Sequence, residues 1–397
     1  MSRPGLSMVA AALLVACASP PQDAAQVEAS TEMSPELAEM NDVSVLLPLP
    51  GDEGQIVARV GAASPARGGS LLPREAYEAA FGPPGTLQAG GTPAPAPHDE
   101  LKLVSFRLDP CFGAECANQI RLVFQPLRVK GGVVSAKDEA VHAFYRLSRD
   151  ELADAVASMI GLRLEATEER LGPLAPHPLA SDDARRAAIE GVVTTFAGEV
   201  NLSRVTTFTT SGLGSAWNFS GFDINDGQAE RVPMVDLPDG TEVVAFFRGF
   251  GGAGALVGDP AFSPRSLAAP EDNLQLLGSI ADAERASEDE RQAAFDALTR
   301  IDDPTIHDAD STDCASCHAA DPVRRLVGEG LWSLTPSAGV GFVPDGRYLD
   351  VEDLAPTSVD ASVNLHMFSY AGTQASIHRR TIHETAAVVA YVNEHVL

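Results

Sequence analysis

The residues with the clearest chemical potential in this sequence are two thiols and an imidazole in its C-terminal third. Residues 313–318 read Asp-Cys-Ala-Ser-Cys-His. In a helical turn, Cys314 and Cys317 lie on one face, and the next side chain, His318, can direct its ring at a metal. Two thiols at this spacing can bond to both vinyl groups of a haem while the imidazole binds the iron. The motif therefore predicts one covalently attached haem c.

Two other interpretations of these cysteines stay open at this point. Cys314 and Cys317 could form a plain disulfide beside an incidental histidine. They could also join Cys111 and Cys116 in a zinc site of four thiolates. In an oxidising compartment, close cysteine pairs are expected to be disulfides. We therefore expect Cys111 and Cys116 to form a disulfide across a short loop.

A haem iron bound by one histidine has a second axial position, and Met367 is the first candidate for it. This methionine follows the motif and precedes the last predicted helix. A thioether opposite a histidine raises the reduction potential, which suits an electron carrier. On an extended segment His366 faces away from Met367, so only one of the two can reach the iron. The histidine alternatives for this position are His366, His307, His378 and His383.

The first seventeen residues predict export and a lipid anchor. The apolar run 6–16 is too short to span a bilayer and is typical of a secretory signal. It ends in Leu14-Val15-Ala16-Cys17, which resembles the lipobox of bacterial lipoproteins. The resemblance implies a signal peptide over 1–16, lipidation of Cys17, and a protein anchored on the periplasmic side of a bacterial membrane. Because Ala18 stands where inner-membrane lipoproteins often carry Asp, the resemblance favours the outer membrane.

The charge balance restricts the partners of the protein. The sequence has 28 Lys and Arg residues against 55 Asp and Glu residues, which gives a net charge of −27. Such an acidic chain repels phosphate, so nucleic acid is excluded as a default partner. The same charge favours a redox partner protein with a basic docking surface and salt-sensitive encounters.

The chain is longer than one ordinary domain of about 150 residues, so we expect more than one core. Residues 17–100 are rich in Ala, Pro and Gly, which predicts a tether with one short helix at 73–81. Residues 101–275 show a mixed pattern, which predicts an α+β domain of unrecognised role. The expected strands are 101–108, 120–129, 141–147, 204–210 and 241–248, with 231–235 pairing 241–248 in a hairpin, and the expected helices are 148–162 and 181–196.

The C-terminal residues 280–397 resemble a class I cytochrome c domain, in which one helix precedes the haem motif and an amphipathic helix follows it. A capping box runs from Ser287 to Glu290 and predicts the first of these helices. A second capping box, from Thr381 to Glu384, predicts the last helix. The resemblance implies an all-α cytochrome c-like domain after the α+β domain.

The same resemblance implies a function in which the protein carries single electrons through its iron and performs no acid–base chemistry. Two alternatives stay open. The protein could be a peroxidase-like enzyme if the sixth iron position is vacant. It could also be a binding or structural lipoprotein in which the haem serves as a sensor.

Overall fold

A computed structural model describes residues 37–82, 96–112, 116–167, 170–210, 216–231, 255–258, 285–307, 314–349, 351–354 and 364–397. The signal segment 1–16, Cys17 and the strand expected at 241–248 lie outside these ranges, and the expected hairpin lies outside them except for Arg231. Within them, no helix combines the length and apolar character that crossing a bilayer requires.

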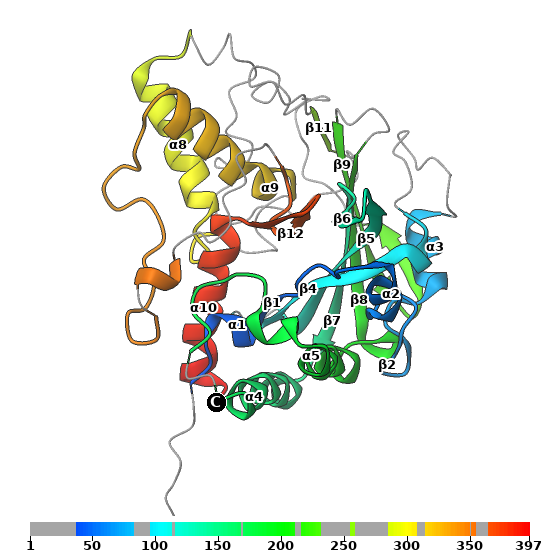
Figure 1. Ribbon diagram of the computed structural model, residues 1–397. Coiled ribbons are helices and arrows are strands. Elements are labelled where there is room, and N and C mark those ends of the chain that lie inside the picture. The colour runs from blue at the N-terminus through cyan, green and yellow to red at the C-terminus, as the bar shows by residue number, and fades with distance from the viewer. Residues whose placement is uncertain are drawn as a thin grey trace, which may run out of the picture. The chain divides into compact units, whose positions relative to one another are not determined.

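A nine-stranded sheet forms the centre of the described structure, in the order β1-β4-β5-β7-β8-β9-β10, with β6 paired to β5 and β11 paired to β9 (Figure 1). Its neighbours are antiparallel except for β11, which runs parallel to β9. Four of the expected strands are present as β4, β5, β7 and β8. The strands are β1 (Ser44–Leu46), β4 (Leu101–Asp109), β5 (Asn118–Lys130), β6 (Val133–Ala136), β7 (Ala140–Leu147), β8 (Leu202–Thr210), β9 (Ala216–Asn225), β10 (Gln228–Arg231) and β11 (Ala255–Gly258).

One face of this sheet, the core face, is apolar. Phe106, Leu122 and Ala143 occupy one row across β4, β5 and β7, and all three are buried. The helices α4 (Arg149–Glu165) and α5 (Asp183–Phe196) contribute buried residues to the same hydrophobic core. Ser148 caps α4 through a capping box, as the sequence predicts. Helix α5 is capped by the side chain of Asp182 and begins at Asp183, whereas the sequence predicts a start at residue 181.

The opposite face, the polar face, carries the alternate residues of the same strands. Ser105, Val123, His142 and Thr206 form one row across β4, β5, β7 and β8. A C-terminal hairpin of β12 (Phe368–Ala371) and β13 (Gln374–Ile377) binds to this face. The Ser105 hydroxyl donates to the Phe368 carbonyl at 2.5 Å, and the backbone N–H of Tyr370 donates to Gln125 Oε1 at 2.9 Å.

Buried ion pairs fasten the last helix, α10 (Arg379–His395), to the polar face. Arg107 on β4 pairs with Asp109 at 2.6 Å and also with Glu384, and Arg380 pairs with Glu384 at 2.8 Å. The capping box predicted at Thr381 and Glu384 is therefore wrong, because the helix begins ahead of Thr381 and the Glu384 carboxylate pairs with two arginines. Those guanidinium groups hold the pKa of Glu384 well below its usual range despite its burial.

The segment predicted to be a tether is structured over residues 37–82 and 96–100. It contains α1 (Met40–Val43), β1, α2 (Glu53–Ala58), the short β2 (Pro65–Ala66) and β3 (Gly69–Ser70) pair, and α3 (Arg74–Phe81), which is the expected short helix. Strand β1 pairs with β4 at one edge of the sheet. A clasp joins this segment to α10, because Ala38 and Asn393 exchange two hydrogen bonds of 2.7 and 3.0 Å between the Ala38 backbone and the Asn393 amide.

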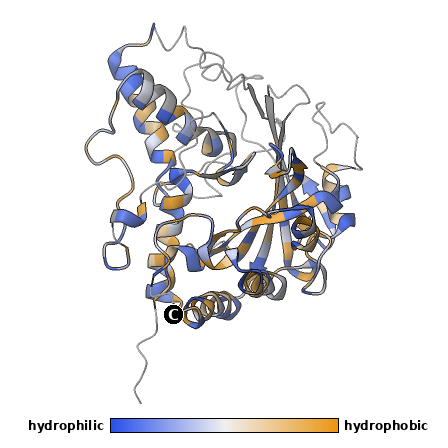
Figure 2. Ribbon diagram, viewed as in Figure 1, coloured by the Kyte–Doolittle hydropathy of each residue, from blue (hydrophilic) through white to orange (hydrophobic). Residues whose placement is uncertain are grey.

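The C-terminal region contains α8 (Glu288–Ile301), α9 (Cys314–Val323), the π-helix η5 (Arg324–Leu331), η6 (Val351–Leu354), the β12–β13 hairpin and α10. Hydrophobic and hydrophilic residues alternate along α8 and α10, as expected for helices with one buried side (Figure 2). Within the described residues, however, no distinct all-α domain stands apart. The expectation of one is corrected: residues Leu37–Leu397 cluster as one mixed α+β unit, because the hairpin and α10 bind directly to the sheet.

Candidate functional site

The Cys-x-x-Cys-His motif lies at the start of α9, and buried charges hold this helix in place. Arg324, which follows α9, is fully buried and pairs with Asp321 at 2.5 Å and with Asp302, just after α8, at 3.1 Å. Gly328 in η5 contacts Phe295 of α8 so closely that an added Cβ would lie 2.0 Å from the ring. These contacts fix the helix that carries Cys317 and His318 against α8.

His318 is buried, and its ring is oriented by the backbone. Its Nδ1 lies 2.6 Å from the carbonyl oxygen of Leu365. Because a carbonyl only accepts hydrogen bonds, Nδ1 carries the proton. Burial, and secondarily the neighbouring His142, lowers the pKa of His318 to about 3, so the ring is neutral and Nε2 keeps its lone pair. Metal-binding histidines use this arrangement, in which a carbonyl fixes one nitrogen and leaves the other for the metal.

The ring of His318 lies among aromatic side chains of the polar face. Its centroid is 5.5 Å from that of Phe208 on β8, 5.3 Å from that of Phe219 on β9, and 6.0 Å from that of His142 on β7. None of these three residues is among the site residues predicted from the sequence. Alternation along the strands could have placed them on one face, but nothing local indicates that α9 packs there.

Met367 and His366 point to different places, as expected for neighbours on an extended segment. The Met367 sulfur lies 3.9 Å from the sulfur of Cys317. His366 is instead directed at the sheet, where its Nε2 lies 2.8 Å from Asp138 and its Nδ1 lies 3.0 Å from the Ser369 hydroxyl. Met367 therefore lies beside the haem motif, and both ring nitrogens of His366 are occupied.

The remaining histidine candidates are buried in other surroundings. His378 is the N-cap residue of α10, and burial lowers its pKa to about 4. Neither of its ring nitrogens has a hydrogen-bond partner within the described residues. His307 is buried in the turn after α8, and Nδ1 of His383 bonds to the carbonyl oxygen of Asp302 at 2.8 Å.

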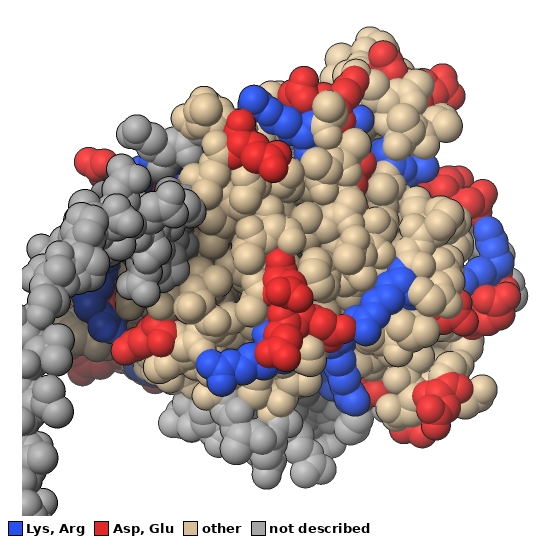
Figure 3. Space-filling view, turned by 90° about the horizontal axis from the view of Figure 1, so that it is seen from below, with Lys and Arg blue, Asp and Glu red and all other residues tan. Residues whose placement is uncertain are grey.

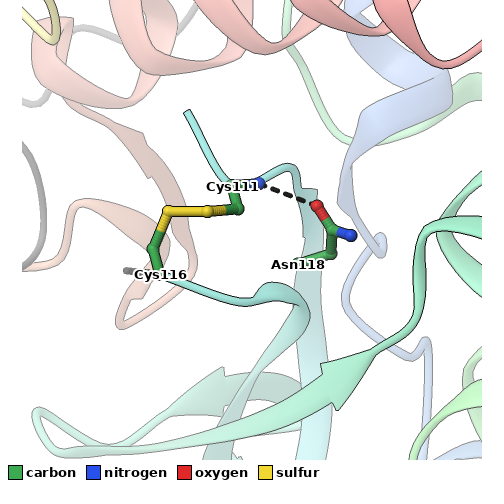
Figure 4. Close-up of a disulfide and its surroundings, with 3 residues drawn as sticks. All are labelled: Cys111, Cys116 and Asn118. Atoms are coloured by element: carbon green, nitrogen blue, oxygen red, sulfur yellow. Dashed lines mark hydrogen bonds between the residues drawn. A yellow bond between two sulfur atoms is a disulfide. The ribbon is translucent and has the colours of Figure 1, made fainter. Parts of the chain in front are cut away.

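The cysteine pair in the loop between β4 and β5 forms a disulfide (Figure 4). Cys111 and Cys116 have a Cα–Cα distance of 5.3 Å, and the Cys111 N–H donates to Asn118 Oδ1 at 2.8 Å. Because Cys111 and Cys116 are bonded to each other, they cannot provide two of the four thiolates of the zinc site that the sequence left open. In the described ranges, no group of three or more His, Cys, Asp or Glu side chains is arranged to hold a metal ion without further ligands.

The donor groups near α9 fit a covalent haem. His318 offers a neutral imidazole with a fixed tautomer, Cys317 precedes it by one residue, and aromatic rings provide an apolar surrounding. Cys314 begins the helix, and its side chain lies outside the described structure. The chain matches no family model, and no curated protein or solved structure shows a significant match to it.

Proposed function

We propose that this protein is an exported, lipid-anchored c-type cytochrome that transfers single electrons. The observation that carries the proposal is the hydrogen bond from His318 Nδ1 to the Leu365 carbonyl, directly after the Cys314–Cys317 spacing. Cys314 and Cys317 would hold the porphyrin, and His318 would bind the iron through Nε2. When bound, haem supplies a one-electron couple that accepts an electron from a reduced partner and passes it to an oxidised one.

The order of elements around the motif supports the cytochrome c resemblance at a finer level. The helix α8 precedes the motif, α9 carries it, and α10 follows it, as in class I cytochromes c. We propose that these helices form the cytochrome c-like part of the protein, completed by the sheet rather than by further helices. The sheet side chains Phe208 and Phe219 would provide an apolar surrounding on the sheet side of His318.

The proposed location is the periplasmic side of a bacterial membrane, where lipid on Cys17 would anchor the protein. The Cys111–Cys116 disulfide supports an oxidising compartment. For the partner, the net charge of −27 favours a redox protein with a basic surface. On the face shown in Figure 3, acidic side chains lie next to basic ones, so this face is mixed in sign.

The direct test is to produce the full chain in a bacterial host that attaches haem c and to measure a pyridine haemochrome spectrum. We expect a c-type spectrum and the mass of one porphyrin on the peptide that contains residues 314–318. The double variant Cys314→Ala, Cys317→Ala should lose both signals completely. The matched control, Cys111→Ser with Cys116→Ser, should retain them. Correctly exported wild-type protein without covalent haem would contradict the proposal.

A second experiment addresses the anchor. Cys17→Ser should move the protein from the membrane fraction to the soluble periplasmic fraction, because a lipid chain contributes about 0.8 kcal/mol per buried CH₂ and the variant has none. Haem content should not change. An unchanged membrane association would contradict anchoring through Cys17.

A further inference from the structure

A buried histidine joins the C-terminal segment to the connection between β6 and β7, residues 137–139. The side chain of His366 is 0% exposed, and its Nε2 lies 2.8 Å from Oδ1 of Asp138 in that connection. The connection is itself fixed to the sheet, because the backbone N–H of Lys137 donates to the Pro126 carbonyl on β5 at 3.0 Å. His366 is therefore held from a well-anchored part of the sheet.

The hydrogen bonds of the second ring nitrogen show where the proton of His366 lies. Oε1 of Gln125 accepts from the Tyr370 backbone N–H at 2.9 Å, and Nε2 of the same amide lies 3.4 Å from His366 Nδ1. An amide nitrogen only donates, so Nδ1 is an acceptor and also takes the proton of the Ser369 hydroxyl at 3.0 Å. His366 thus donates through Nε2 to the Asp138 carboxylate.

A hydroxyl, an imidazole and a carboxylate in this order also occur in hydrolases that use a serine nucleophile. Ser369, however, is only 2% exposed, so its hydroxyl cannot reach an external substrate. The hydrogen bonds from Ser369 through His366 to Asp138 therefore hold the histidine ring in place and do not activate a nucleophile.

The backbone around His366 connects this histidine to the Cys-x-x-Cys-His motif. The His366 N–H donates to Asn364 Oδ1 at 2.9 Å, and the Ser376 hydroxyl donates to the His366 carbonyl. The residue between Asn364 and His366 is Leu365, whose carbonyl accepts from His318 Nδ1 at 2.6 Å. A displaced His366 ring would turn the adjoining peptide and weaken the hydrogen bond on His318.

We propose that Asp138 is a positioning residue for the haem ligand His318. It holds His366, and with it the Leu365 carbonyl, so that the hydrogen bond on His318 Nδ1 keeps its length and direction. This inference rests on the proposed function. A hydrogen bond from Nδ1 makes a ligating imidazole a stronger electron donor, which favours oxidised iron, so weakening the bond should raise the reduction potential.

The test uses full-length protein carrying covalent haem, examined by redox titration and by NMR of the His318 Nδ1–H in the reduced state. Asp138→Leu removes the acceptor of His366 with little change in side-chain size. The potential should rise, and the Nδ1–H should exchange with solvent about tenfold faster, because the segment loses one buried hydrogen bond. Asp138→Asn keeps an acceptor oxygen without the charge, and it should retain the wild-type exchange rate.

Two further variants complete the test. Glu139→Leu is the matched control, because it removes the next carboxylate, which lies 3.9 Å from Lys137, and it should leave the exchange rate unchanged. Ser369→Ala removes the hydrogen bond on the other ring nitrogen of His366 and should also accelerate exchange. It provides the result if Asp138→Leu does not fold.

Two results would overturn the positioning role. One is a wild-type exchange rate in Asp138→Leu or, if that variant does not fold, in Ser369→Ala. The other is an equal acceleration in Glu139→Leu. The same exchange measurement on full-length protein made without haem attachment tests the hydrogen bond independently of the iron. Absent haem in the wild-type haemochrome assay would contradict the proposed function, whereas unchanged exchange in loaded protein would contradict only the role of Asp138.

Discussion

The two faces of the central sheet differ in what their side chains do, although they alternate along the same strands. The core face presents Phe106, Leu122 and Ala143 to the hydrophobic core that includes residues of α4 and α5. The polar face presents arginine, glutamine and histidine side chains, which bind β12, α10 and the region of α9 through hydrogen bonds, ion pairs and ring contacts. One face therefore supplies stability through buried apolar area, and the other positions chemical groups.

The largest expected effect comes from truncating the core face. Phe106 is 1% exposed, and Phe106→Ala should lower the free energy of unfolding by about 3–5 kcal/mol through lost burial and a residual cavity. Val123→Ala, on the polar face of the neighbouring strand, should cost only about 1 kcal/mol because its side chain is half-buried. Urea unfolding of both variants measures the difference. Equal losses would mean that the two faces do not differ in this way.

The second effect tests whether the polar face is held by charge. Glu384→Gln removes the carboxylate that the buried guanidinium groups of Arg107 and Arg380 share, although Arg107 keeps its pair with Asp109, and should cost about 3 kcal/mol in unfolding free energy. Glu394→Gln on the same helix is the control. Its ion pair with Arg347 lies at the surface, where such pairs contribute about 0.5 kcal/mol or less. A Glu384→Gln loss no larger than that of the control would contradict the role of this ion network.

The third effect is confined to mildly acidic pH and concerns a buried histidine away from the Cys-x-x-Cys-His motif. Burial lowers the pKa of His177 to about 4, whereas an unfolded chain holds histidine near about 6.5. As pH falls, the unfolded state takes up this proton first. The stability linked to His177 is therefore complete above pH about 6.5 and is lost as pH falls toward 4.

His177→Gln should remove this dependence and flatten the stability profile by up to about 1.4 kcal/mol per pH unit. Urea unfolding at several pH values between these limits measures the slope. A variant whose slope equals that of the wild type would show that His177 is not the titrating group.

Much of the sheet and its helices could be predicted from sequence because the signals are local. Alternating apolar residues identify β4, β5, β7 and β8, and the capping boxes at Ser148 and Ser287 identify the starts of α4 and α8. The short strands were not predicted from the sequence. Strand β1 and the β12–β13 hairpin have few residues each, and their positions depend on distant partners in β4 and β5.

The residues of the candidate site also fall into two groups, those that a local motif predicts and those whose position depends on the fold. The spacing of Cys314, Cys317 and His318 is a local motif, so it can be recognised without a structure. The neighbourhood of His142 depends on which face of the sheet receives α9, and that choice is made by ion pairs and hydrogen bonds between residues far apart in the chain. The capping box predicted at Thr381 does not form for a related reason, because Arg107, far away in the sequence, and Arg380, one helical turn earlier, attract the Glu384 carboxylate.

The clasp between Ala38 and Asn393 has a mechanical consequence. A pull transmitted along the chain from residue 36 reaches Leu37, whose carbonyl accepts a hydrogen bond from Arg163 of α4, and then Ala38, whose two hydrogen bonds pass load to α10. From there the ion pair of Glu384 with Arg107 carries it into β4, the strand next to the edge strand β1. Tension on the N-terminal segment is thus shared between the edge strand and the last helix, so neither has to bear it alone.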